Sequence, residues 1–141
     1  MEGERLATWT RFLKAHSAIS RRLERDLADA HSLTLSDYDV LLQLSRAPDQ
    51  RLRPVEIARA VLLTRSGITR LVQGLEREGL VERLDCPGDA RGFLVALTPE
   101  GIDLVRRARE THLEGVAEQF ADRFTDEELG ALARLLERLP I

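Results

Sequence analysis

The spacing of apolar residues predicts helices over most of the chain, and the clearest of them covers residues 64–79. Four apolar side chains there recur at i, i+3, i+4 and i+7 and form a single stripe: Ile68, Leu71, Val72 and Leu75. Thr64 is a favourable N-cap residue, and Gly79 suits the position just beyond a helix C-terminus. The segment is therefore predicted to be an amphipathic helix with one buried face.

The other face of this helix is polar and basic. It carries Arg65, Ser66, Thr69, Arg70, Gln73 and Arg77. Carboxylates appear only in the last turn, at Glu76 and Glu78. Such side chains can donate hydrogen bonds to phosphates and to base edges in the DNA major groove. A solvated amphipathic helix has the same pattern, so the helix alone supports both interpretations.

Three further helices are predicted before it. The first covers residues 5–30 and has a broad apolar stripe: Leu6, Trp9, Phe12, Leu13, His16, Ile19, Leu23 and Leu27. The second begins with Ser36 as N-cap, Asp39 at the third position and a Leu35–Val40 hydrophobic staple. The third begins at Pro54, a residue favoured at the first helical position. Its short turn into residues 64–79 indicates a helix-turn-helix.

The apolar period changes from 3.6 towards 2 after Gly79. Residues 80–84 are predicted to form a strand, residues 85–92 a turn, and residues 93–97 the return strand. Arg91 would lie near the tip of this hairpin. A hairpin directly after a recognition helix is the wing of a winged helix, and an exposed wing arginine can enter the minor groove.

Two more helices follow the hairpin. Thr98 and Pro99 are expected to begin a helix that runs to about Asp122. The last helix has a capping box of Thr125 and Glu128. The predicted fold is therefore mainly α with a small β-hairpin wing.

Composition places the chain among globular proteins. Of its 141 residues, 43% are hydrophobic and 32% are charged, which suits one domain. It has no apolar run of membrane-spanning length and no secretory signal, and its single cysteine, Cys86, cannot form an internal disulfide. We therefore expect a cytoplasmic protein without membrane association.

Charge is distributed unevenly around a net value of −3. Residues 51–97 carry 8 basic and 6 acidic side chains, whereas the segments on both sides have an acidic excess. The positive middle third contains the polar helix face. This distribution would confine DNA binding to one part of the surface.

The sequence argues against catalysis and metal binding. It has no Gly-rich phosphate loop, no Cys-His pair and no Ser-His-Asp order with motif context. The three histidines show no ligand spacing, and one cysteine is too few for a typical zinc site. We expect neither an enzyme nor a cofactor.

Residues 35–101 resemble the MarR family of transcription regulators. The resemblance is carried by LSDYDVLLQL, by VEIARAVLLTRSGITRLVQGLEREGLVERL and by CPGDARGFLVALTPEG. Its most specific parts are TRLVQGLEREGLV and the pattern Asp89-x-Arg91 followed by Leu97-Thr98-x-x-Gly101. It implies one MarR-like domain over residues 1–141. A winged helix-turn-helix lobe would cover 33–100, and dimerisation helices would cover 1–32 and 101–141.

The resemblance also implies partners and roles. The partners would be a second copy of the chain and a pseudo-palindromic double-stranded DNA operator. The implied DNA-binding residues are Arg65, Ser66, Thr69, Arg70, Gln73, Asp89 and Arg91. Arg65 would contact phosphate, Arg91 would be the wing arginine, and Asp89 would orient it or a neighbouring basic residue.

Members of this family often respond to a small anionic or aromatic effector in a crevice between the dimer helices and the DNA-binding lobe. The candidate lining residues here are Trp9, Phe12, His16, Tyr38 and His112. The alternative for Trp9, Phe12 and His16 is the dimer core, which is favoured because apolar stripes at helical spacing are usually core. The expected function is a homodimeric repressor that such a ligand releases from its operator.

Two alternatives stay open at this point. A redox-responsive regulator would act through Cys86, although redox members of the family usually carry the reactive cysteine in the N-terminal helix. A winged helix that binds proteins instead of DNA would lack a basic face. The presence of Arg65, Arg70 and Arg91 argues against that second alternative.

Overall fold

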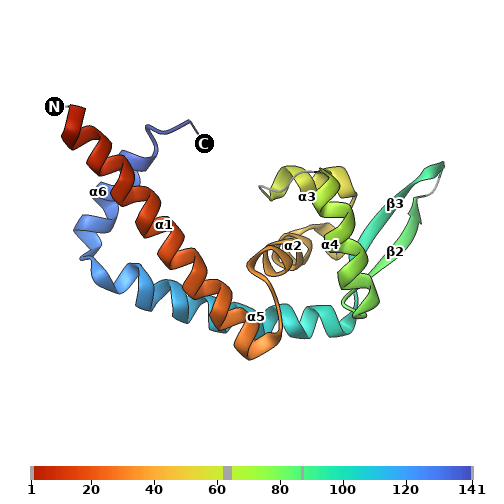
Figure 1. Ribbon diagram of the computed structural model, residues 1–141. Coiled ribbons are helices and arrows are strands. Elements are labelled where there is room, and N and C mark those ends of the chain that lie inside the picture. The colour runs from red at the N-terminus through yellow and green to blue at the C-terminus, as the bar shows by residue number, and fades with distance from the viewer. Residues whose placement is uncertain (1, 62–64, 87, 141) are drawn as a thin grey trace.

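A computed structural model of the chain describes residues 2–61, 65–86 and 88–140. Helices dominate, and three short strands form one sheet (Figure 1). The elements in chain order are α1 (Glu2–His31), α2 (Leu35–Arg46), η1 (Pro48–Gln50), β1 (Arg51–Leu52), α3 (Pro54–Ala60), α4 (Arg65–Arg77), β2 (Val81–Cys86), β3 (Asp89–Leu97), α5 (Pro99–Gln119), η2 (Ala121–Arg123) and α6 (Asp126–Leu136).

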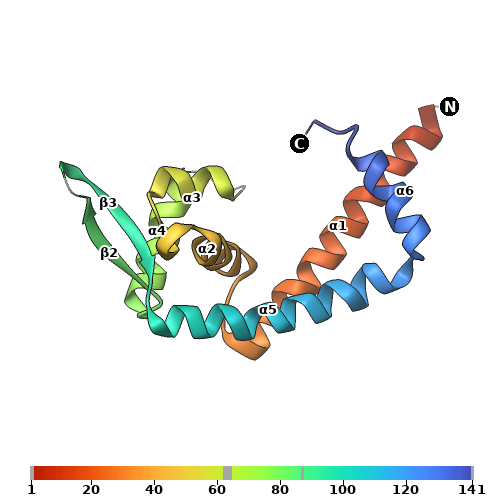
Figure 2. The ribbon, with the colours of Figure 1, turned by 180° about the vertical axis from the view of Figure 1, so that it is seen from behind.

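The molecule has a helical end and a mixed α/β lobe. In Figures 1 and 2, α1, the distal part of α5 and α6 form the helical end, where both chain termini lie. Helices α2, α3 and α4 and the sheet form the lobe, and α5 extends from one part to the other. Within the described part of the chain, no helix is both long and apolar enough to cross a membrane.

The start of α2 differs from the prediction. Thr34 is the N-cap: the Asp37 N–H donates to Thr34 Oγ1 at 2.9 Å, and the Thr34 N–H donates to the Asp37 carboxylate at 3.1 Å. The predicted cap at Ser36 with Asp39, and the staple built on it, are wrong. Both pairs fit the same spacing, and the helix uses the earlier one, so Leu35 is already helical.

Three other predicted helix starts are confirmed, whereas α1 begins at Glu2, before the predicted residue 5. Pro54 is the first residue of α3. Thr98 caps α5, where its Oγ1 accepts from the Gly101 N–H at 3.1 Å. Thr125 and Glu128 form the capping box of α6. Each of the two threonine N-caps contributes about 1 kcal/mol to the stability of its helix.

The sheet is larger than the predicted hairpin. Its strand order is β1-β3-β2, and β1 pairs through Arg51 with Ala96, although the sequence predicted no strand before Pro54. Cys86 pairs with Asp89, so the predicted turn over 85–92 is too long. The Pro, Gly and Asp residues of this segment favour turns, so the sequence pattern did not reveal the ends of the two strands. The antiparallel pairing of β2 and β3 nevertheless extends to Cys86 and Asp89, with a register shift between Asp85 and Cys86.

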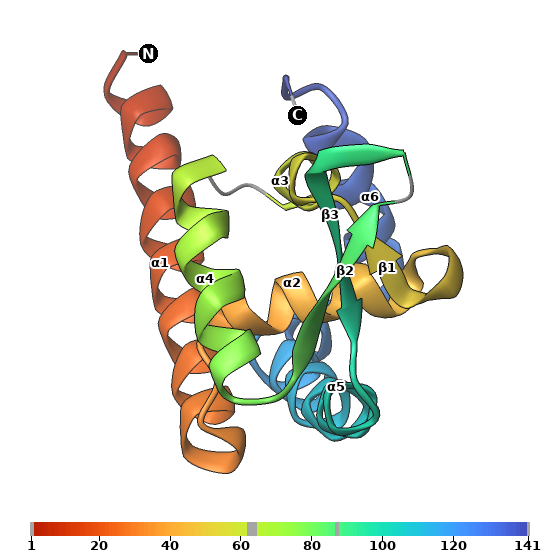
Figure 3. The ribbon, with the colours of Figure 1, turned by 90° about the vertical axis from the view of Figure 1, so that its right-hand side faces the viewer.

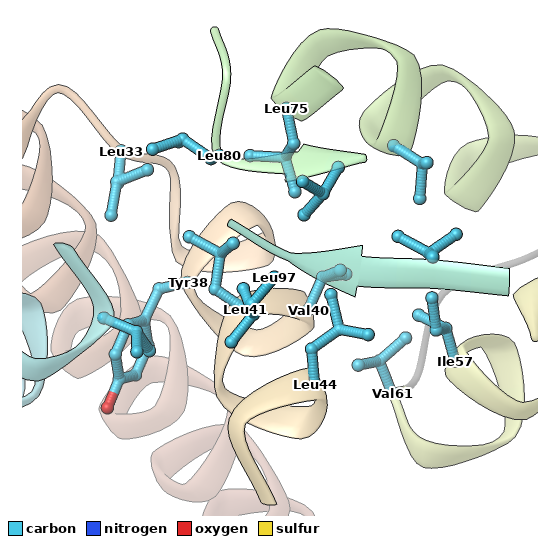
Figure 4. Packing of buried hydrophobic residues seen from close by; sticks show 14 of the residues in the cluster. Leu33, Tyr38, Val40, Leu41, Leu44, Ile57, Val61, Leu75, Leu80 and Leu97 are labelled. Atoms are coloured by element: carbon cyan, nitrogen blue, oxygen red, sulfur yellow. The ribbon is translucent and has the colours of Figure 1, made fainter. Parts of the chain in front are cut away.

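The core lies where α2, α3, α4 and the sheet meet (Figure 4). Its most completely buried side chains are Leu27, Leu33, Val40, Leu41, Leu44, Ile57, Ile68, Val72, Leu75, Val81 and Val95. Full burial of one such side chain contributes about 1.5–3 kcal/mol. The Tyr38 hydroxyl points away from the other labelled side chains in Figure 4.

Candidate nucleic-acid interface

Helix α4 is held by its apolar side. Ile68 is fully buried, and Val72 and Leu75 are each 2% exposed. Leu71 is partly buried and packs against the same cluster. The stripe predicted from the sequence is therefore the inner face of the helix, and it fixes which side chains face outward.

The outward face carries the predicted polar residues. Thr69, Arg70, Gln73 and Arg77 are exposed. Arg65 and Ser66 belong to the first turn of α4, but their side chains fall outside the described part of the structure, as does Thr64, the predicted N-cap. The exposed groups can reach a ligand with hydrogen-bond acceptors, such as a DNA groove.

The C-terminal end of α4 turns the chain into the wing. Gly79 has φ 76°, a left-handed conformation that glycine adopts without steric cost. The Leu80 N–H donates to the Leu75 carbonyl at 2.9 Å, and the Gly79 N–H donates to the Glu76 carbonyl at 3.0 Å. This capping confirms the predicted end of the helix.

A contact that sequence reasoning missed links α4 to the wing. The Glu76 carboxylate lies 3.1 Å from Arg83 Nε in β2. The Arg83 guanidinium also lies 4.5 Å from the centre of the Phe93 ring in β3. At this exposure the ion pair contributes at most about 1 kcal/mol. The pair joins the last turn of α4 to the first strand of the hairpin.

A second junction links the end of α4 to α5. Thr98 Oγ1 donates to the Gly79 carbonyl at 2.6 Å, and the Thr98 N–H donates to the Leu80 carbonyl at 3.1 Å. Gly101 packs so closely that an added Cβ would lie 2.1 Å from Leu80 O. The sequence identified Thr98 and Gly101 as part of a pattern, but it did not predict their contacts with Gly79 and Leu80.

The wing carries the remaining predicted residues. Asp89 and Arg91 lie in β3, and their side chains are outside the described part. Figure 3 shows the hairpin of β2 and β3 beside the short β1 strand. Cys86 is partly buried at the end of β2, and Arg53 Nη2 donates to its Sγ at 3.1 Å.

A cavity of about 690 Å³ lies between α1, α2 and α5. It is lined by His16, Ser20, Arg21, Glu24, Leu35, Ser36, Tyr38, Asp39, Leu42 and His112. Three of the five predicted ligand residues therefore meet there. Trp9 and Phe12 do not line it; they stack on each other with ring centres 5.9 Å apart.

Two aromatic rings form one wall of this cavity. The rings of Tyr38 and His112 lie 4.8 Å apart. Burial lowers the pKa of His112 more than the nearby Asp39 raises it. Burial also raises the pKa of Tyr38, against the opposing effect of Arg109 and Arg46. Both side chains are therefore uncharged at neutral pH.

Comparison with known proteins identifies the family. A family model described as MarR family matches residues 31–92. The regulator PecS of Dickeya dadantii is 31% identical over 123 residues, which cover 86% of this chain and 72% of PecS. The chain belongs to the MarR family. The homoprotocatechuate degradative operon repressor of Escherichia coli is 31% identical over 113 residues, which cover 80% of this chain and 74% of the repressor.

The fold agrees with this assignment. Sco3205, a MarR family transcriptional regulator from Streptomyces coelicolor solved in complex with DNA, superposes with a TM-score of 0.92. The two proteins are 31% identical, and the match covers 97% of this chain and 86% of Sco3205. The chain is accordingly a DNA-binding transcriptional regulator with a winged helix, and not an enzyme.

Proposed function

We propose that this MarR-family chain is a homodimeric repressor that binds a pseudo-palindromic operator and is released by a small anionic or aromatic ligand. The observation that carries the proposal is the arrangement of α4. Its apolar side is locked into the core, and its exposed side presents Thr69, Arg70 and Gln73 next to the wing.

The proposed DNA contacts follow from this arrangement. Exposed side chains of α4 enter the major groove, and the wing contacts the adjacent minor groove. The groove contacts are Ser66, Thr69, Arg70 and Gln73; Arg65 binds phosphate; Arg91 is the wing arginine that Asp89 orients. Operator binding requires the compartment that holds the chromosome, so the proposal includes a cytoplasmic location.

Exposed apolar side chains support the dimer. Leu6 and Trp9 on α1 are 65% and 55% exposed, and the others are Phe12, Leu13, Leu113, Phe124, Leu135 and Leu139. All belong to α1, to the distal part of α5 or to the segment after it. Extended apolar faces of this kind mark protein interfaces. A second copy covering residues 1–32 and 101–141 would space two α4 helices about one DNA turn apart, roughly 34 Å.

Repression is supported by a relative. The homoprotocatechuate degradative operon repressor carries that activity in its name. A dimer seated across a promoter would block polymerase sterically. In-vitro transcription should therefore show less transcript as the protein is added, and a rise in transcript would contradict repression.

Ligand release is supported by the position of the cavity. Its walls come from α1 and α5 on one side and from α2 of the DNA-binding lobe on the other. A ligand that fits one relative placement of these helices better would shift the population toward it. Conformers with misplaced α4 helices would then leave the operator.

The experiment that tests the proposal selects bound duplexes from a random DNA pool. We expect a pseudo-palindromic winner whose log affinity falls steeply with log salt, as phosphate contacts require. Selection of an asymmetric site, or no enrichment by the folded protein, would contradict it.

The dimer is tested separately by light scattering. Leu13→Glu, which places a charge on the exposed apolar face, should yield monomers and weaken operator binding. Ala15→Glu introduces the same charge at an exposed position outside the apolar stripe and should retain the dimer. Equal behaviour of the two variants would contradict the proposed interface.

A further inference from the structure

The cavity between α1, α2 and α5 has more negative than positive charge on its walls. Two carboxylates line it, those of Glu24 and Asp39, against one guanidinium, that of Arg21. The other lining groups are hydroxyls, imidazoles and aliphatic side chains. The charges of these two carboxylates and one guanidinium sum to one net negative charge.

The aromatic wall adds no positive charge. His112 stays neutral at pH 7 because burial lowers its pKa. Arg46 and Arg109 are near enough to Tyr38 to lower its pKa, but neither of them lines the cavity. A ligand carboxylate placed against the Tyr38 and His112 rings would therefore meet one guanidinium on the walls, that of Arg21, against two carboxylates, and burying it there costs free energy.

The two carboxylates on these walls have acceptor sites that the described hydrogen bonds do not use. One oxygen of Asp39 accepts from Gln43 Nε2 at 3.2 Å, and the Glu24 carboxylate accepts from the Leu35 N–H. A carboxylate has about four acceptor sites, so both retain capacity for a ligand. His112 Nδ1 is buried and has no hydrogen-bond partner in the described part of the chain.

From these groups we infer that the cavity takes an aromatic molecule with amine or hydroxyl donors and no negative charge. This inference rests on the proposed function and names the ligand class of its regulatory site. The ring of the ligand packs against Tyr38 and His112, and its donors face Asp39 and Glu24. Of the anionic or aromatic effectors expected from the sequence, the anionic kind is disfavoured.

Three small phenols test this directly, because they share one ring and differ in the charge of one substituent. Tyramine carries an ammonium group, tyrosol a hydroxyl and 4-hydroxyphenylacetate a carboxylate. In titration calorimetry at pH 7 with the full chain, tyramine and tyrosol should each bind at least about tenfold more tightly than 4-hydroxyphenylacetate.

Matched variants assign the preference to the cavity. Asp39→Asn keeps an acceptor oxygen for Gln43 but removes one negative charge, so it should reduce the preference for tyramine over 4-hydroxyphenylacetate several-fold. Glu110→Gln removes a charge from an exposed position of α5 that does not line the cavity, and it should leave the preference unchanged. Circular dichroism establishes that both variants are folded.

Equal or tighter binding of 4-hydroxyphenylacetate by the unmodified protein would overturn the inference, and so would no binding of any of the three phenols at millimolar concentration. Operator binding without ligand is measured in parallel. If the operator is bound but the charge preference is absent or reversed, the ligand class is wrong and the regulator proposal stands. If no operator is found, the proposed function itself fails.

Discussion

Replacing Gly101 by alanine tests whether the junction between α4, the wing and α5 depends on close backbone packing. The added Cβ would lie 2.1 Å from Leu80 O and 3.1 Å from Leu97 Cδ2. The Leu80 carbonyl cannot retreat freely, because it accepts a hydrogen bond from the Thr98 N–H at 3.1 Å. Either α5 moves away from the sheet or this hydrogen bond breaks.

The cost follows from these contacts. Overpacking of this kind costs about 1–3 kcal/mol, and loss of the hydrogen bond adds about 0.5–1.5 kcal/mol. The better helix propensity of alanine offsets up to about 1 kcal/mol. We expect a net loss of about 1–3 kcal/mol for Gly101→Ala.

Urea denaturation followed by circular dichroism measures this loss. The protein concentration is held fixed, because the stability of a dimer depends on it. Gly74→Ala is the matched control: its Cβ would meet only Arg77 Nη2, at 3.9 Å, so it should be neutral or stabilising by up to about 1 kcal/mol. If Gly101→Ala and Gly74→Ala unfold at the same urea concentration, the junction is not close-packed and the reasoning is wrong.

Three further predictions use other contacts. Thr98→Ala removes both the bond to the Gly79 carbonyl and the cap of Gly101, and should cost about 1–2 kcal/mol in urea melts, whereas Thr98→Ser should recover most of it. Burial lowers the pKa of His112, so below about pH 6.5 its imidazole binds a proton in the unfolded chain more readily than in the folded chain. The free energy of unfolding should therefore fall as pH drops below about 6.5, and His112→Asn should make that part of the stability profile flatter. Gly88 has φ 84°, so Gly88→Ala should strain the wing by about 1–2 kcal/mol, measured against Gly74→Ala in the same urea series.

Local sequence signals predicted the helices well, because their evidence lies within a few residues. The apolar stripe of α4, its glycine end and the caps at Thr98 and Thr125 all depend on neighbours in the chain. The start of α2 was mispredicted for the same reason, because two overlapping capping patterns compete and local spacing does not rank them.

Long-range contacts were not predictable in this way. Strand β1 has two residues and exists because β3 pairs with it, and the wing strands extend through a segment rich in turn residues. The Glu76–Arg83 ion pair joins elements that nothing in the local pattern connects.

The candidate sites also differ in whether their residues could be predicted from local sequence signals. The outward position of Thr69, Arg70 and Gln73 followed from helix periodicity. The cavity forms where three helices that are distant in the sequence meet, so local patterns could not predict its full lining. Three of the five residues predicted to bind a ligand line it, and the other two, Trp9 and Phe12, lie outside it.

The most direct test of the proposed DNA-binding face of α4 is the operator affinity and base preference of Arg70→Gln. Arg25→Gln, which removes a charge from an exposed position on α1, is the matched control. We predict that Arg70→Gln, which loses a proposed base contact, binds the selected duplex about 1–3 kcal/mol more weakly and relaxes the base preference at one position of the site. The control should retain the affinity and the base preference. Equal affinity and base preference for the two variants would contradict the account.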